Sequence, residues 1–325
     1  MAWNRVLDLE AGIAMVVTDL HGDGEAYARY RDRFLDLHAH GQADFLILAG
    51  DLLHRTPPDP DNSLAMILDV LRLKAELGDR IIYLMGNHEM PHRYSFTLQR
   101  GNDVFTPRFE WAMADNRPQI MALLDSLPFY VRTKAGVSLC HAGAFPGASS
   151  SVGERLFALS HEMVLAETAV AIPSEIRPGY RRLLARQNKT SYDQLIHDNF
   201  AITSPDDPRY DDPLIGSVAL SNHPDLSLLW NALFTRNEIQ HGRAYPTYQK
   251  ELLHALSYQF DTQATLVTGH IDCESGYTLV NKQQLRLASA KHAHPRESGH
   301  FLLFDVGEKI SSAEELLTNL GSVFS

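Results

Sequence analysis

The chain has 325 residues, of which 44% are hydrophobic and 21% charged, an ordinary composition for a globular protein with a substantial core. Its formal net charge of −11 argues against nucleic acid or an anionic membrane surface as the main partner. Two cysteines, Cys140 and Cys273, are too few for a disulfide framework, and no long apolar segment opens the sequence. We therefore expect a cytoplasmic protein that binds neither nucleic acid nor membrane.

The first part of the chain alternates between predicted strands and predicted helices. Apolar, β-branched runs at 12–18, 45–48 and 80–85 predict three strands, with amphipathic helices at 25–38 and 62–77 between them. Short continuous apolar runs bounded by turn residues are typical of strands that are covered on both faces. This alternation indicates a parallel α/β sheet.

In the later part of the chain, the predicted helices and strands do not alternate regularly. Periodicity predicts further helices at 109–127 (interrupted near Asn116), 154–171, 179–200 and 247–258, and further strands at 127–132, 136–140, 265–268, 285–289 and 300–305. The segment from about 149 to 216 is mostly helical and contains a polar, proline-rich linker. We interpret it as a helical insertion, with the potential to cap a site, within a single domain spanning 1–325.

Residues of the kind that bind metals follow five of these strands. In chain order they are Asp19 and His21, then Asp51, then Asn87 and His88, then His141, then His270. Ligands of open α/β sheets bind where strands end, and alternation along an extended chain places Asp19 and His21 on the same side. Carboxylate, imidazole and amide oxygen together suit manganese, iron or zinc. Six or seven such residues are too many for one ion and suit two, with a carboxylate between ions about 3.5–4 Å apart.

The order and spacing of these residues resemble a known family. The motifs Asp19-x-His21, Gly50-Asp51-x-x-x-Arg55, Gly86-Asn87-His88-Glu89, His141-Ala-Gly143 and Gly269-His270 look like those of the calcineurin-like metallophosphoesterases, and within them of the phosphoprotein phosphatase branch. The resemblance covers roughly 12–148 and 217–306. It implies an α/β sandwich: two mixed β-sheets packed together and flanked by helices, with the metal site at the strand ends.

The resemblance also implies a role for each residue that matches a motif. It places two divalent ions in the site, with manganese expected and iron or zinc as alternatives. It assigns the first ion to Asp19, His21 and Asp51, and the second to Asp51, Asn87, His141 and His270. It makes His88 the general acid that protonates the leaving group, and Arg55 and Arg243 the arginines that grip the phosphate.

Three positions depart from the family pattern. His54 stands where the family has an aspartate that pairs with the catalytic histidine, so another group is expected to tune the acidity of His88. Asn231 replaces the aspartate of a Leu-Leu-Trp-Ser-Asp-Pro motif, and Lys291–His294 stands where an aromatic residue is expected. These departures concern substrate specificity more than metal chemistry.

The expected function is therefore a two-metal phosphomonoesterase, similar to protein serine/threonine phosphatases, that works by direct attack of metal-bound hydroxide. Its substrate would be a phosphorylated protein or a small phosphate ester. The alternatives are a dinucleoside tetraphosphate hydrolase or a phosphodiesterase, and a non-enzymatic scaffold. The sequence leaves the physiological substrate, the cellular metal and the oligomeric state open.

Overall fold

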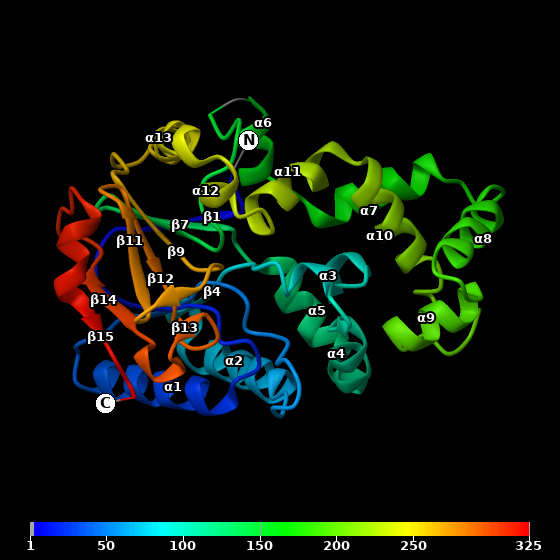
Figure 1. Cartoon of the computed structure of the whole chain (residues 1–325), viewed down its shortest axis with the longest axis horizontal. Coiled ribbons are helices and arrows are strands. Elements are labelled where there is room, and N and C mark those ends of the chain that lie inside the picture. The colour runs from blue at the N-terminus through cyan, green and yellow to red at the C-terminus, as the bar shows by residue number, and fades with distance from the viewer. Residues whose placement is uncertain (1–2, 150, 325) are drawn as a thin grey trace. The chain divides into compact units, whose positions relative to one another are not determined.

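The computed structural model describes residues 3–149 and 151–324. It divides into two compact units (Figure 1). The first unit comprises residues 1–89, 126–159 and 230–325, and the second comprises 90–125 and 160–229. The prediction of one domain with an insertion at 149–216 stays a prediction.

The first unit contains a five-stranded sheet with the order β15-β14-β2-β3-β4. Its strands are β2 (Ile13–Val17), β3 (Phe45–Leu48), β4 (Ile81–Tyr83), β14 (Phe301–Asp305) and β15 (Leu320–Gly321). The pairs β2–β3 and β3–β4 are parallel, while β14 runs antiparallel to β2. Two helices connect the parallel strands: α1 (Gly24–Ala39) and α2 (Ser63–Leu77). The predicted parallel strand–helix alternation is confirmed.

A six-stranded sheet in the same unit has the order β1-β7-β8-β9-β12-β11. Its strands are β1 (Val6–Leu9), β7 (Tyr130–Thr133), β8 (Val137–Cys140), β9 (Thr265–Thr268), β11 (Tyr277–Asn281) and β12 (Gln284–Leu287). The pairs β7–β8 and β11–β12 are antiparallel, and the other pairs are parallel. Both sheets of the unit are therefore mixed.

One hydrophobic core joins the two sheets. It combines buried side chains of the five-stranded sheet, such as Val16 and Ile47, with those of the six-stranded sheet, such as Leu139, Val267 and Leu285. Full burial of such a side chain stabilises the folded state by about 1.5–3 kcal/mol relative to leaving it exposed. The predicted architecture of two mixed sheets packed together is confirmed, and it fixes the strand ends relative to one another.

Shorter elements complete the first unit. They are β10 (Cys273–Glu274), β13 (Ala293–His294), α6 (Ser151–Phe157), α12 (Asn237–Gln240), η3 (Gly242–Ala244) and α13 (Tyr245–Leu256). Further 3-10 turns are η1 (Gly78–Arg80), η4 (Arg296–Ser298) and η5 (Ala313–Asn319). Helix α11 (Pro224–Leu233) begins in the second unit and ends in the first.

The second unit is mainly helical. It contains α3 (Met90–Tyr94), β5 (Gln99–Arg100), β6 (Asp103–Val104), α4 (Thr106–Met113), η2 (Ala114–Asn116), α5 (Arg117–Ser126), α7 (His161–Ala171), α8 (Arg177–Gln187), α9 (Tyr192–Phe200) and α10 (Asp212–Asn222). The predicted interruption near Asn116 is confirmed, because η2 separates α4 from α5.

Two predicted helices are each divided in two. The predicted helix at 154–171 is broken before Ser160, whose side chain accepts the N–H of Met163 and caps α7. The predicted helix at 179–200 is broken before Ser191, which caps α9 in the same way through Gln194. A serine that bonds to the backbone three residues later favours a helix start over a helix interior. Periodicity alone did not separate these segments.

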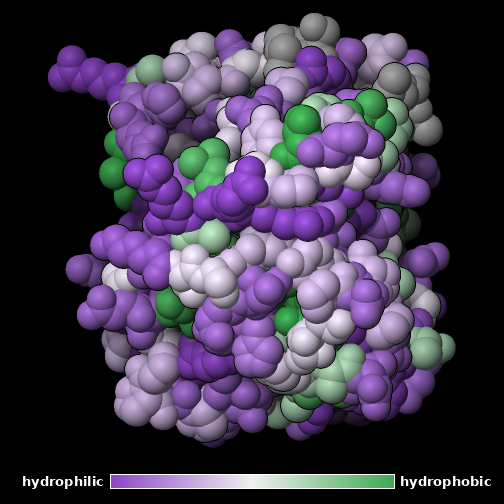
Figure 2. Space-filling model, turned by 90° about the vertical axis from the view of Figure 1, so that its right-hand side faces the viewer, coloured by the Kyte–Doolittle hydropathy of each residue, from purple (hydrophilic) through white to green (hydrophobic). Residues whose placement is uncertain are grey.

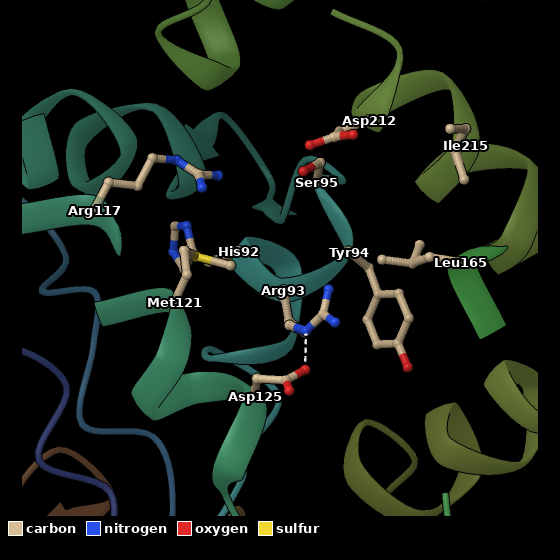
Figure 3. A pocket seen from close by; sticks show the side chains of 10 residues that line it. All are labelled: His92, Arg93, Tyr94, Ser95, Arg117, Met121, Asp125, Leu165, Asp212 and Ile215. Atoms are coloured by element: carbon tan, nitrogen blue, oxygen red, sulfur yellow. Dashed lines mark hydrogen bonds and ion pairs between the residues drawn. The ribbon is translucent and has the colours of Figure 1, made fainter. Parts of the chain in front are cut away.

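The second unit has a small core and a cavity of its own. The core gathers buried side chains such as Tyr192, Ile196 and Phe200. The cavity, of about 290 Å³, is lined by side chains including Arg93, Arg117 and Asp212 (Figure 3). Figure 2 shows the face on which this helical unit lies. This face is mostly hydrophilic, with scattered hydrophobic residues. In the described part of the chain, every helix is too short or too polar to span a membrane.

Candidate metal centre

The predicted ligand residues lie on the loops that follow the strands of the first unit. Several of these residues have an unusual backbone conformation: φ is positive at Asp19 (50°), His21 (46°), Asp51 (53°) and His270 (68°). A positive φ is uncommon for residues with a side chain and clusters at functional sites, where the surrounding structure enforces it. The turns thus direct the side chains at a cost in backbone strain.

Three groups of side chains present ligand atoms within 4.8 Å of one another. They are Asp19, His21 and His292; His21, Asp51 and His88; and Asp51, His141 and His270. Asp51 belongs to two of these groups and contacts a histidine of each, with its Oδ2 lying 3.4 Å from Nε2 of both His21 and His141. Asp51 therefore lies in the centre of the cluster.

His141 defines one half of the cluster. Its Nδ1 lies 3.0 Å from the carbonyl oxygen of Ala49, so in the neutral ring this nitrogen carries the proton and donates it. Its Nε2 then carries no proton and presents a lone pair. This atom lies 2.9 Å from Oδ1 of Asn87 and 3.2 Å from Nδ1 of His270. His270 Nε2 lies 3.3 Å from the carbonyl oxygen of Phe234, so in the neutral ring this nitrogen carries the proton. The Nδ1 atom of His270 then presents the lone pair.

With His141 in the neutral form that binds a metal, four lone-pair atoms face one another at this point: those of His141 and His270 together with the oxygens of Asn87 and Asp51. Such atoms repel unless a cation lies between them. Histidine ligands of metals commonly donate their other ring N–H to a backbone carbonyl, as these two do. The donor set fits a divalent ion.

The other half of the cluster has unpaired buried nitrogens. His21 Nε2 and His292 Nδ1 are buried and have no hydrogen-bond partner among the described residues, although both lie near carboxylates at 3.3–4.0 Å. Buried polar groups are nearly always satisfied. A second ion at this position would satisfy both.

The electrostatics of the cluster attract positive charge. Burial lowers the pKa of His141, but the carboxylates of Asp51 and Asp19 outweigh it and raise the pKa to about 9. Burial would raise the pKa of Asp19, but the neighbouring His292 and His141 outweigh it and lower the pKa to about 2. Burial lowers the pKa of His270 to about 3. The carboxylates thus stay ionised and His270 stays neutral, which are the forms that bind metals, while His141 would release a proton when an ion binds.

Backbone hydrogen bonds fix the loops relative to one another. The N–H of His88 donates to Oδ1 of Asp51 at 2.9 Å, and the N–H of His270 donates to Oδ2 of Asp19 at 3.0 Å. Glycines allow this close approach: a Cβ at Gly86 would collide with the backbone and carboxylate of Asp51. The glycine of the Gly86-Asn87-His88-Glu89 motif therefore has a steric reason.

His54 and His88 form a histidine pair, with 3.0 Å between their Nδ1 atoms. Partial burial lowers the pKa of His88 to about 4, against the opposing charge of Asp51. The structure thus places the imidazole of His54 beside His88, where the family has a carboxylate.

The two predicted arginines differ in their surroundings. Arg55 is mostly buried and forms ion pairs with Asp23 at 2.9 Å and Asp59 at 2.8 Å. Arg243 lies exposed in η3, and within residues 3–149 and 151–324 it forms no hydrogen bond or ion pair with the cluster. The predicted roles of both stay predictions.

Two residues of the site received no role from the sequence. His292 joins the group of Asp19 and His21, although its segment stood out only as a departure from the family pattern. Glu89 belongs to a quoted motif, and its carboxylate accepts backbone N–H groups of Asp51, Leu52 and Gly86 at 2.9–3.0 Å. The position of His292 shortly after a strand end is the signal that could have identified it.

Comparison with known proteins supports the resemblance seen in the motifs. Residues 14–168 match the family model of the calcineurin-like phosphoesterases, so the resemblance predicted from the motifs is confirmed over this part of the chain. The matched stretch is just under half of the chain, so the chain is similar to the calcineurin-like phosphoesterases over these residues.

Individual relatives cover the chain to different extents. A symmetrical bis(5'-nucleosyl)-tetraphosphatase from Nitrosococcus oceani is 30% identical over 134 residues, which span 40% of this chain and 43% of that protein. A protein serine/threonine phosphatase from Saccharomyces cerevisiae is similar in structure, with 12% identity, a TM-score of 0.49, and coverage of 92% of this chain and 76% of that chain. A cold-active protein-tyrosine phosphatase from a Shewanella species has 15% identity and a TM-score of 0.44, with coverage of 92% and 76%. Because both TM-scores lie below 0.5, the resemblance to the family rests on the sequence match alone.

Proposed function

We propose that the protein is a two-metal-dependent phosphoesterase that hydrolyses phosphomonoesters in the manner of a protein serine/threonine phosphatase. The observation that carries the proposal is the position of Asp51, which contacts a histidine of each half of the cluster through the same oxygen. A shared carboxylate between two ions suits displacement at phosphorus. Asp19, His21 and Asp51 would hold the first ion, and Asp51, Asn87, His141 and His270 the second.

The two ions would supply Lewis acidity toward the phosphoryl oxygens and an activated water as nucleophile. The chain's own residues would do the rest. His88, whose backbone N–H donates to Oδ1 of Asp51, would hold on its imidazole the proton that the leaving-group oxygen receives. Because burial lowers the pKa of His88 to about 4, the negative charge of a bound phosphate ester is needed to keep that proton in place. Arg55 would break its ion pair with Asp59, whose side chain is exposed, and bind the phosphate in its place.

Manganese is the expected metal, with iron or zinc as alternatives, because the ligands combine carboxylate, imidazole and amide oxygen. To test the proposal, metal-free protein is reconstituted with each ion, its metal content is measured, and turnover of p-nitrophenyl phosphate is followed. Two bound ions with turnover support the proposal. Two bound ions without turnover contradict it and favour the non-enzymatic scaffold.

A second candidate function is hydrolysis of a dinucleoside tetraphosphate. It is supported by the 30% identity over 134 residues to a symmetrical bis(5'-nucleosyl)-tetraphosphatase. Rates on a phosphoserine peptide, diadenosine tetraphosphate and bis-nitrophenyl phosphate would separate the two candidates and the phosphodiesterase alternative. A preference for diadenosine tetraphosphate by at least tenfold in kcat/KM, with ADP as the product, would replace the phosphomonoesterase assignment.

Three further expectations belong to the same proposal. The substrate partner is a phosphorylated protein or a small phosphate ester, and the place of action is the cytoplasm. The helical segment at 149–216 is proposed to act in substrate selection as a cap. Deleting it and repeating the comparison of the substrates named above tests that role, since a cap limits large substrates.

A further inference from the structure

We propose that His292 is a further protein ligand of the first ion, which would then be held by Asp19, His21, Asp51 and His292. The inference rests on the proposed two-metal function. It adds an imidazole that none of the motifs contains, from a segment that follows the last strand of the six-stranded sheet.

The side chain of His292 is directed at the first half of the cluster. Its Nδ1 lies 3.3 Å from Oδ1 of Asp19, and its ring centre lies 5.1 Å from that of His21. The ligand atoms of Asp19, His21 and His292 all lie within 4.8 Å of one another. His292 is 8% exposed, so the surrounding packing fixes the position of its side chain in the cluster.

The backbone holds this segment against the first strand-end loop. The N–H of Lys291 donates to the carbonyl oxygen of Asp19 at 3.1 Å, and the N–H of Cys273 donates to that of His292 at 2.7 Å. The hydroxyl of Ser289 accepts the N–H of Thr18 at 3.0 Å. The residue next to His292 is thus bonded to Asp19 itself, which places the imidazole before any ion arrives.

The unpaired ring nitrogens of His292 and His21 indicate that these side chains are metal ligands. Nδ1 of His292 and Nε2 of His21 are both buried, and neither finds a hydrogen-bond partner among the described residues. A histidine that served only to orient Asp19 would aim a ring N–H along the line to the carboxylate, whereas Nδ1 of His292 lies 3.3 Å from Oδ1 of Asp19 without the alignment of a hydrogen bond. Two imidazole nitrogens without partners, converging on two carboxylates, are instead the arrangement that a cation completes.

The additional imidazole has a chemical consequence. It supplies a neutral nitrogen ligand, so it tightens the site without adding negative charge. Nitrogen ligands favour zinc, iron and other later divalent metals over magnesium and calcium. The first ion is therefore expected to discriminate against magnesium more strongly than three ligands alone would.

The test compares metal binding by wild type, His292→Ala and His294→Ala. His294 is the matched control, because it lies two residues away, its side chain is 58% exposed, and it pairs with Asp272 at 3.3 Å. Metal-free protein is titrated with Mn²⁺, with free Mn²⁺ measured by electron paramagnetic resonance. We expect wild type and His294→Ala to bind two ions, and His292→Ala to bind one of them more weakly, by at least the roughly 10–100-fold that loss of an outer-shell partner costs.

Loss of affinity alone would also follow if His292 only oriented Asp19, so a second readout is needed. Protein labelled with ¹⁵N-histidine is saturated with ¹¹³Cd²⁺ at both sites, and the imidazole nitrogens that show a ¹⁵N–¹¹³Cd coupling are counted by NMR. The expected count falls from four in wild type, from His21, His292, His141 and His270, to three in His292→Ala. An unchanged count, or an unchanged affinity, overturns the assignment.

Failure of the proposed function gives a different result: either wild type itself binds no pair of ions, or it binds the pair with His292 as a ligand but turns over no phosphate ester. If His292→Ala does not fold, anomalous diffraction from zinc-loaded wild-type crystals decides. An ion about 2.0–2.1 Å from a ring nitrogen of His292 supports the ligand assignment. An ion bound by Asp19 and His21 but distant from His292 overturns it.

Discussion

Glu89 holds the backbone of Asp51: its Oε2 accepts the N–H of Asp51 at 3.0 Å and also that of Gly86 at 2.9 Å. One buried carboxylate therefore joins the loops that follow β3 and β4. Since Asp51 and Asn87 lie on these two loops, Glu89 sets the spacing between the central carboxylate and a ligand of the second ion. It contributes geometry to the site without being one of the proposed ligands.

Replacement of Glu89 by Gln should destabilise the metal-free protein. The amide keeps the size of the side chain but presents an NH₂ group to a backbone N–H that had an acceptor. An unsatisfied buried donor costs about 1–3 kcal/mol, so the free energy of unfolding should fall by that amount. Burial raises the pKa of Glu89 to about 7, and urea unfolding is therefore measured at pH 8.5, where the wild-type carboxylate is ionised.

The control for this change is Glu76→Gln. Glu76 is exposed and pairs with Arg72 on the surface of α2, and exposed ion pairs contribute about 0–1 kcal/mol. Equal unfolding free energies for both variants would show that the bonds of Glu89 do not stabilise the loops.

Asp51→Asn should lower activity more than His88→Ala. Removal of a general acid costs on the order of 10²–10⁴-fold, whereas loss of the shared carboxylate weakens the binding of both ions. Metal content and kcat are measured together for the two variants. Near-normal turnover and metal content in Asp51→Asn would contradict the two-metal proposal.

The role of His88 can be isolated by the leaving group. A p-nitrophenolate leaves without protonation far more readily than a phenolate, so His88→Ala should lose more activity on phenyl phosphate than on p-nitrophenyl phosphate. Equal losses on the two esters would show that His88 does not deliver the proton.

His54→Asp should raise the pKa of His88. A carboxylate in place of the imidazole 3.0 Å away favours the imidazolium form, which opposes the burial that lowers the pKa to about 4. The general acid then stays protonated to higher pH, so the basic limb of the kcat/KM profile on phenyl phosphate should move upward. His54→Gln, which adds no charge, serves as the control and should leave that limb in place.

Metal binding should stabilise the fold. An ion that binds only the native state adds about 2.7 kcal/mol at a concentration 100 times its Kd, because it neutralises the buried carboxylates and pairs the free imidazole nitrogens. Calorimetry with and without Mn²⁺ measures the gain in Tm. The gain should be smaller in Asp51→Asn, and an equal gain in both proteins would place the ions elsewhere.

Much of the fold followed from periodicity and turn residues. The strand at 45–48 was predicted with its observed bounds, because a continuous apolar run between polar turns has few other structures open to it. The helix boundaries at Ser160 and Ser191 were not predicted, because a capping bond depends on the local backbone and leaves the apolar period unchanged. The partition into two units was also beyond periodicity, since residues 90–125 join 160–229 only through tertiary packing.

The site was predictable where its residues directly follow a strand. Asp51, His141 and His270 each end a buried strand, so sheet topology brings them together. His292 lies five residues beyond Leu287, the last residue of β12, and its approach to Asp19 depends on loop hydrogen bonds such as that of Lys291. Bonds of that kind leave no periodic pattern in the sequence.

The origin of the ligands has a mechanical consequence. Asp19, Asp51 and Asn87 follow strands of the five-stranded sheet, while His141 and His270 follow strands of the six-stranded sheet. A bound metal pair would cross-link the two sheets at one edge of their shared core, much as a disulfide restrains distant segments. Amide hydrogen exchange should then slow in all five loops together on metal loading, so that opening of the site and separation of the sheets become a single cooperative event.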